Sequence, residues 1–273
     1  MKKLLVTLFA LTLSPSMVNA VEIDPQLQSA LRSFKALTRL EVKGVSRTPT
    51  IGMFALYTNN GPMLINHTGQ LLYSKDQSFH SDVKGAIAGK KHQNIRAEAI
   101  SEISEDNVIV IKKGSGSKRV VVNTALDCPY CLKQEKLLAE NNELDVTLLL
   151  IPSVLDKQNW PVLEKVMCSS DRAAAWHAYM LNRVVPDNNG QCFWSDNFSF
   201  LGQTIYTSTV LHTVGTPQML YGDGRVQTFK EQTPLGVAPN FDKGNKDLFD
   251  PKNIKTAYFS DEVYVPKKKL FNW

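Results

Sequence analysis

The chain of 273 residues is long enough for one large domain or for two domains of ordinary size. Its formal net charge of +5 is too small, and its charges are too evenly spread, to indicate a protein that binds nucleic acid. It has only four cysteines, which excludes a disulfide-dense scaffold, so each cysteine pair needs its own explanation.

Residues 1–20 have the pattern of a secretory signal peptide. Two lysines precede an apolar run from Leu4 to Leu13, and small and polar residues follow up to Ala20. The apolar run is too short to span a bilayer as a helix. We therefore expect cleavage after Ala20 and export into an oxidising compartment, in which disulfides form and persist.

Residues 21–84 are expected to form one helix followed by an antiparallel meander. Within residues 24–40, leucine, alanine and phenylalanine recur at helical spacing, with Asp24 as a plausible N-cap and Pro25 at the first helical position. Four short strand-like runs follow, and turn sequences separate the last three. A unit of this size has a thin core of its own, which favours additional burial by self-association.

Residues 85–105 are polar, with alanine and isoleucine at helical spacing, and are expected to form a largely helical linker. The second domain, residues 106–230, begins with a β-branched run, a helical pattern and another apolar run of strand length. A strand, a helix and a strand with short connections predict a βαβ unit with parallel strands and a right-handed crossover.

The motif Cys128-Pro129-Tyr130-Cys131 lies where the first of these strands turns into the helix. Pro129 suits the first helical turn, so Cys128 is expected at the helix N-terminus, where free N–H groups and the helix dipole favour an anion. A thiolate in such a place can have its pKa lowered from about 8.5 into the range of roughly 3.5 to 7.5. We expect Cys128 to be an exposed, activated thiolate and Tyr130 to tune the disulfide or to touch substrate.

Zinc is disfavoured as an explanation, because it would need two further ligands at typical spacing. Cys168 and Cys192 are far apart in the sequence, and the five histidines show no ligand spacing. A purely structural disulfide between Cys128 and Cys131 would close too small a loop to restrict the unfolded chain. A redox role of the thioredoxin type remains, for which no metal and no cofactor is expected.

A second feature, around Pro217, supports this interpretation. A helical stretch ends near residue 214, and a Gly-Thr-Pro sequence, a strand, a Gly-Asp-Gly turn and another strand follow. The thioredoxin fold has this order, with a cis-proline at the start of the hairpin beside the active cysteines. Only about 5–6% of X–Pro bonds are cis, but this position predicts a cis bond between Thr216 and Pro217.

Taken together, these motifs resemble the DsbC/DsbG family of exported thiol:disulfide isomerases, over residues 21 to about 230. The resemblance implies a two-domain α+β and α/β chain: a cystatin-like dimerisation domain, a linker helix, and a thioredoxin-like catalytic domain with a helical insertion. It implies the following sites: Cys128 and Cys131 as the redox pair, Pro129 and Tyr130 in the active-site loop, Thr216 and Pro217 as substrate-binding residues, and a structural disulfide between Cys168 and Cys192.

The resemblance further implies a periplasmic homodimer that acts on disulfide-containing exported proteins and is kept reduced by a membrane thiol reductant of the DsbD type. Other functions stay open: a net disulfide oxidase, a reductase of single oxidised cysteines, or a chaperone or assembly factor for an exported machine. Two features depart from the family. Ala125 replaces its usual acidic residue, while Asp127 adjoins Cys128 and is expected to oppose thiolate formation. Residues 231–273 form an atypical extension.

Overall fold

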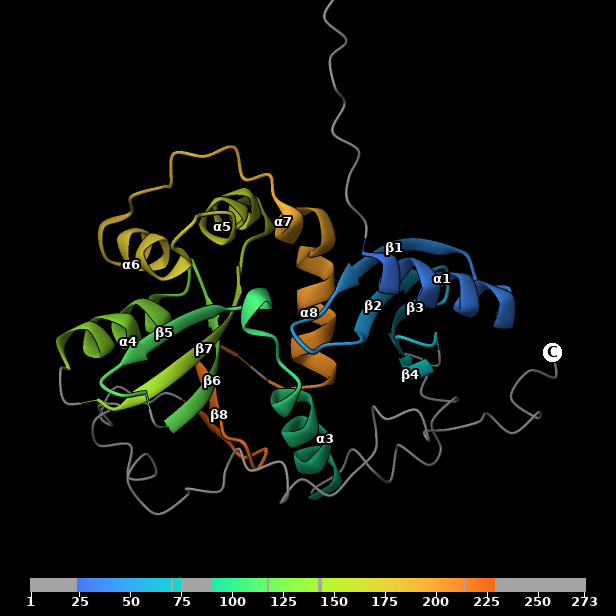
Figure 1. Cartoon of the computed structure of the whole chain (residues 1–273), viewed down its shortest axis with the longest axis horizontal. Coiled ribbons are helices and arrows are strands. Elements are labelled where there is room, and N and C mark those ends of the chain that lie inside the picture. Colours follow the sequence, from blue (N-terminus) through green and yellow to red (C-terminus); the bar gives the residue numbers. More distant parts are fainter. Residues whose placement is uncertain are drawn as a thin grey trace, which may run out of the picture.

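The computed structural model describes residues 24–69, 71–74, 90–116, 118–141, 144–213 and 215–228 (Figure 1). The predicted signal peptide and the extension at residues 231–273 lie outside these ranges.

The N-terminal part is one helix followed by a four-stranded meander. The helix α1 (Pro25–Leu37) begins after Asp24, whose carboxylate accepts the N–H of Gln26. The strands are β1 (Val42–Arg47), β2 (Met53–Thr58), β3 (Gly61–Asn66) and β4 (Leu71–Ser74), in the order β1-β2-β3-β4 with every pair antiparallel. The predicted helix-plus-meander arrangement is therefore present within residues 24–74.

The meander buries apolar side chains on both of its faces, because alternate residues of a strand point to opposite sides. On one face, Phe54, Leu56, Met63 and Ile65 pack against Leu27, Ala30 and Phe34 of α1. On the other face, Met53, Ala55 and Leu64 belong to a cluster that includes Ile205 and Tyr206 of helix α8 (Phe200–Thr209). Figure 1 shows α8 standing between the meander and the second sheet.

This second contact differs from what the sequence led us to expect. The burial that we assigned to self-association is found within the chain, against α8. A polar contact accompanies it: the hydroxyl oxygens of Thr50 and Tyr206 lie 2.7 Å apart, and Thr50 also donates to the carbonyl of Ala99 at 3.0 Å. The apolar residues on both faces of β2 were the sequence signal for this packing.

The linker region contains α3 (Lys90–Ser101) and a 3₁₀ turn η2 (Glu105–Asn107). Ala97, Ala99 and Ile100 of α3 are buried, and Ala99 and Ile100 belong to the cluster shared by the meander, α8 and the second sheet. Residues 85–89 of the expected linker lie outside the described ranges.

The second sheet has the strand order β5-β7-β6-β8-β9. Its strands are β5 (Ile109–Lys113), β6 (Lys118–Ala125), β7 (Val146–Ser153), β8 (Gln218–Leu220) and β9 (Val226–Thr228). The strands β6 and β7 are parallel and are joined through α4 (Pro129–Glu140), as the βαβ pattern predicts, and all other pairs are antiparallel. Val120 and Val122 point to the layer of α4, whereas Val121 points to the layer of α8.

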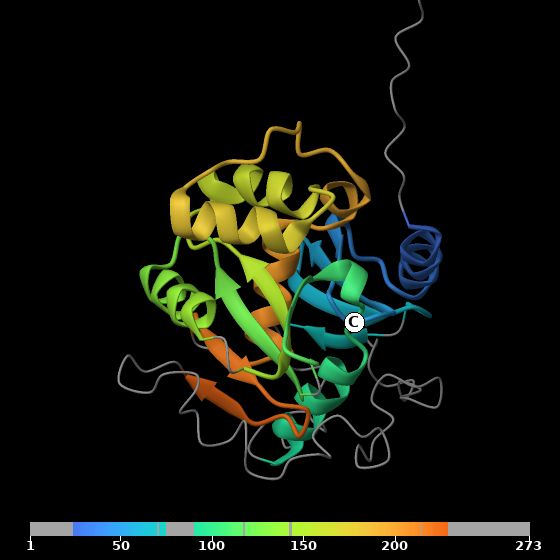
Figure 2. The same ribbon diagram turned by 60° about the vertical axis from the view of Figure 1, so that its left-hand side comes forward.

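A helical insertion connects β7 to α8 and covers one end of the sheet (Figure 2). It consists of the 3₁₀ turn η3 (Lys157–Asn159) and the helices α5 (Trp160–Met167), α6 (Arg172–Asn182) and α7 (Phe193–Asn197). Cys168 and Cys192 form a disulfide that joins the end of α5 to the start of α7. Trp160 stacks on Trp194 with ring centroids 5.5 Å apart, so these aromatic side chains pack the insertion as expected.

Candidate redox-active site

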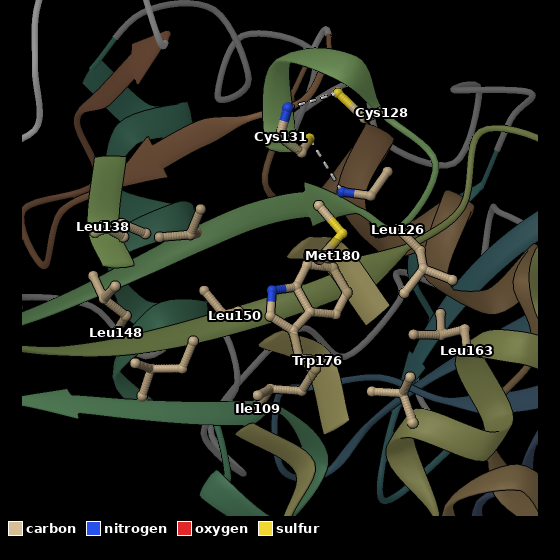
Figure 3. Packing of buried hydrophobic residues seen from close by; sticks show 14 of the residues in the cluster. Ile109, Leu126, Cys128, Cys131, Leu138, Leu148, Leu150, Leu163, Trp176 and Met180 are labelled. Atoms are coloured by element: carbon tan, nitrogen blue, oxygen red, sulfur yellow. Dashed lines mark hydrogen bonds between the residues drawn. The ribbon is translucent and has the colours of Figure 1, made fainter. Parts of the chain in front are cut away.

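The CPYC motif lies at the turn from β6 into α4 (Figure 3). Cys128 is the N-cap of α4, and Pro129 occupies its first turn. Backbone N–H groups in the first turn have no partner within the helix, so a proline there loses no helical hydrogen bond. The N–H of Cys131 donates to the sulfur of Cys128 at 3.2 Å. The helix start therefore places one free backbone donor on the first sulfur, as the position of Pro129 predicts.

Both cysteines are thiols in this structure, and both are buried. Cys131 contributes to the core beneath α4, where its sulfur accepts the N–H of Ala125 at 3.4 Å. Only 3% of the surface of Cys128 is exposed, which corrects the expectation of an exposed thiol. The reason is a contact distant in sequence: the carbonyl of Thr216 accepts from the sulfur of Cys128 at 3.4 Å.

The environments of the two thiols shift their pKa values in opposite directions. A hydrogen bond from the Cys131 thiol, with smaller ones from the side chain of Thr216 and from the N–H groups of Cys131 and Tyr130, outweighs burial and lowers the pKa of Cys128 to about 6. Burial raises the pKa of Cys131, and its hydrogen bond to Cys128 raises it further. At neutral pH, Cys128 is the thiolate and Cys131 holds the proton.

The bond between Thr216 and Pro217 is cis, and this loop lies against the first cysteine. Asn123 of β6 holds the preceding residues, since its side-chain amide donates to the hydroxyl of Thr213 at 3.1 Å and to the carbonyl of Gly215 at 3.4 Å. The structure thus brings four of the candidate residues together at one end of the sheet: Cys128, Cys131, Thr216 and Pro217.

Arg96 of α3 is a buried residue that the sequence analysis missed. Its guanidinium donates to the carbonyl of Leu211 at 2.6 Å and to that of Gly224 at 2.5 Å, which flank the cis-proline loop on both sides. Burial lowers the pKa of this guanidinium. The signal in the sequence was a single arginine among the apolar residues of the linker helix.

Cys168 and Cys192 lie in the helical insertion, joined to each other, and not in the CPYC site. Tyr130 is exposed, as a residue inside the active-site loop was expected to be. Within the described ranges, the structure has no group of three or more metal-ligating side chains.

Three features define a redox domain of the thioredoxin type. They are a pair of thiols of unequal acidity at a helix N-terminus, a cis-proline loop against that pair, and a central parallel βαβ unit. The fold class is accordingly a mixed sheet covered by helices, joined to an antiparallel meander.

Comparisons with known proteins agree with this class. The chain is similar to the thiol:disulfide interchange protein DsbC of Escherichia coli K12, with 23% identity over 199 residues, which covers 72% of this chain and 80% of that protein. The probable DsbC of Bordetella pertussis is 23% identical over 208 residues, covering 74% and 69%. The chain is therefore DsbC-like in sequence. No family model matches the sequence.

Two solved structures are also similar. A disulfide interchange protein from Neisseria gonorrhoeae is 25% identical, with a TM-score of 0.40, over 46% of this chain and 87% of that one. DsbG of Helicobacter pylori is 11% identical, with a TM-score of 0.33, over 70% and 98%.

Proposed function

We propose that this protein is a thiol:disulfide interchange enzyme, a disulfide isomerase and reductase that acts on exported proteins through Cys128 and Cys131. The observation that carries the proposal is the geometry of the pair: Cys128 is the N-cap of α4 and its sulfur accepts the N–H of Cys131 at 3.2 Å, whereas the thiol of Cys131 is buried. A nucleophile that is ionised at neutral pH stands beside a buried thiol that keeps its proton, and thiol–disulfide exchange needs both roles.

The reaction begins when the Cys128 thiolate attacks one sulfur of a client disulfide. A bond forms between Cys128 and that sulfur, the client disulfide breaks, and the second client sulfur leaves as a thiolate. This thiolate can attack another client disulfide, which forms a new client disulfide and sets free a different client thiolate. When a client thiolate attacks the client sulfur of the mixed disulfide, a client disulfide forms there, the bond to Cys128 breaks and Cys128 leaves as a thiolate. Alternatively, Cys131 loses its proton and attacks Cys128, which oxidises the pair to a disulfide and releases the client reduced by two electrons.

Burial of Cys131 favours the isomerase branch. The hydrogen bond to a Cys128 thiolate is lost in the mixed disulfide, but burial of Cys131 remains and keeps its thiolate scarce. A slow resolving step gives the client time to rearrange while it is still attached. The backbone of Thr216 and Pro217 lies beside the reacting sulfur, and we assign to it the binding of the client chain.

The proposed location is the periplasm, on the basis of the signal-like residues 1–20. In the part of the chain that the structure describes, no helix is both long and apolar enough to cross a membrane. An isomerase must begin each cycle reduced, so we propose a membrane thiol reductant of the DsbD type as a partner. We further propose a homodimer formed through residues 21–84, with residues 85–105 as the linker, 106–230 as the catalytic domain and 231–273 as an extension.

The experiment that tests the function is Cys131→Ala in cells that export the protein. We expect mixed disulfides to accumulate on Cys128, because the resolving thiol is gone, and to be absent in Cys128→Ala. Adducts mapped to Cys168 or Cys192 would overturn the site assignment. A variant that lacks both Cys128 and Cys131 and still restores client folding in full would favour the chaperone alternative.

A further inference from the structure

Asp127 is a charged residue beside the nucleophile that the exchange mechanism does not use. A carboxylate near a thiolate opposes it by like-charge repulsion, but the hydrogen bonds to Cys128 prevail at this site and lower its pKa. The carboxylate of Asp127 is bonded to another segment of the chain.

The carboxylate of Asp127 accepts three hydrogen bonds from a single segment, the one that leaves β7 and leads into α5. The N–H of Leu155 donates to Oδ1 at 2.6 Å, and the N–H of Asp156 donates to Oδ2 at 2.8 Å. The side-chain amide of Asn159 also donates to Oδ2, at 2.8 Å. Burial opposes ionisation of Asp127, but these hydrogen bonds outweigh it and hold its pKa below the ordinary value.

These bonds fix the segment directly beside the redox motif. The N–H of Leu126 donates to the carbonyl of Ser153 at 2.9 Å, so the two chain stretches are joined at successive residues. The backbone of Leu155 is tethered in this way, yet its side chain is 59% exposed. Tyr130, two residues after the nucleophile, is 56% exposed.

A single exposed leucine is ordinary on a protein surface. Leu155 differs because a charge-assisted hydrogen bond holds its backbone next to Asp127, which precedes Cys128 in the sequence. Hydrogen bonds of this kind are stronger than neutral ones. A client that is not yet folded exposes apolar side chains that its folded state would bury, and such side chains fit a fixed apolar contact at this place.

We propose that Asp127 is a positioning residue that holds Leu155 beside Cys128 as a contact for apolar side chains of the client chain. The inference rests on the proposed function and names the chemistry of the client that the same site accepts. Asp127 therefore favours protein clients over small disulfides.

The test compares two substrates of the full mature protein: scrambled ribonuclease A and oxidised glutathione, which has no apolar side chain. We expect Leu155→Ser to lower the ratio of the ribonuclease rate to the glutathione rate by about 3- to 10-fold, the effect of losing burial of about half a leucine. The matched control is Leu37→Ser, at the end of α1, where the leucine is 62% exposed and far along the chain from the redox motif.

Asp127→Ala is expected to lower the same ratio by a similar factor, because the hydrogen bonds that hold the backbone of Leu155 and Asp156 are lost. Asp127→Ala combined with Leu155→Ser should lower the ratio no further than either change alone, since both remove one contact.

An unchanged ratio in Leu155→Ser would overturn the proposal, and so would an equal fall in Leu37→Ser. Because the side chain of Leu155 is exposed, Leu155→Ser is expected to fold normally. It therefore tests the proposal even if Asp127→Ala reduces the stability of the protein. A failure of the proposed function has a different signature, because the unaltered protein would then exchange with neither substrate.

Discussion

Gly202 lies in the first turn of α8, where this helix meets β1 of the meander. A Cβ atom built on Gly202 would lie 2.2 Å from the hydroxyl oxygen of Ser46 and 2.3 Å from its Cβ atom. Ser46 is buried in β1, and its hydroxyl accepts the N–H of Ser199 at 3.0 Å. Gly202→Ala should therefore force the meander and α8 apart.

The expected magnitude follows from three contributions. Overpacking of a tight contact costs about 1–3 kcal/mol. Loss of the hydrogen bond between Ser199 and Ser46 costs about 1 kcal/mol more. Replacing glycine by alanine in a helix returns about 0.5–1 kcal/mol. We expect Gly202→Ala to lower the free energy of unfolding by about 2 kcal/mol, whereas an uncrowded helical glycine would be stabilised by the same change.

Urea unfolding of the disulfide-intact protein measures this change, and hydrogen exchange of the β1 and β2 amides reports whether the meander loosens. Ser208→Ala, on the exposed side of α8, is the control for helix propensity. Gly202→Ala paired with Ser46→Gly should recover part of the loss, because the atoms that clash are gone. A stabilised Gly202→Ala protein, or one that Ser46→Gly does not rescue, would refute the close docking of the meander on α8.

Three further predictions concern the redox domain. Alkylation of Cys128 should follow a titration with a midpoint of about pH 6. Because this pKa is below the ordinary value of a thiol, the thiolate stabilises the reduced folded protein at high pH. Urea unfolding should show that this contribution to the free energy of unfolding is lost as the pH falls through about 6. Replacing both Cys168 and Cys192 by alanine should cost about 3 kcal/mol in urea unfolding, because their disulfide closes a loop with a sequence separation of 24. Arg96→Met should lower the free energy of unfolding by about 1–3 kcal/mol, because the buried carbonyls of Leu211 and Gly224 lose their donor. It should also shift the midpoint of Cys128 alkylation, whereas a substitution remote from the redox loop should leave that midpoint unchanged.

Local rules were enough to predict the start of α4. The N-cap position of Cys128 follows from a cysteine before a proline at a strand-to-helix turn, and the cis bond before Pro217 follows from the order of elements after the motif. Burial of Cys128 was not predictable in this way. It depends on the carbonyl of Thr216, which lies 88 positions further along the chain.

The role of Asp127 illustrates the same limit of sequence reasoning. The sequence shows that Asp127 is next to Cys128, which predicts repulsion between the carboxylate and a thiolate from their charges alone. The direction of the carboxylate depends on three donors that lie 28 to 32 positions away, and no spacing rule relates them. The wrong expectation of an exposed thiol and the incomplete one about Asp127 both concern contacts that only the tertiary structure supplies.

The docked meander changes the physical basis for a dimer. Self-association is not needed to bury its second face, because α8 covers that face within one chain. The N–H of Asp24 donates to the side-chain oxygen of Asn197 at 3.1 Å, and the Asp24 carboxylate pairs with Arg47 at 2.9 Å, so α1 is also tied to the helical insertion. If residues 21–84 pair two subunits, the redox centres are then held at fixed positions relative to the dimer interface. Client retention would depend on a rigid cleft, and loosening the contact between the meander and α8 should reduce isomerisation more than simple disulfide reduction.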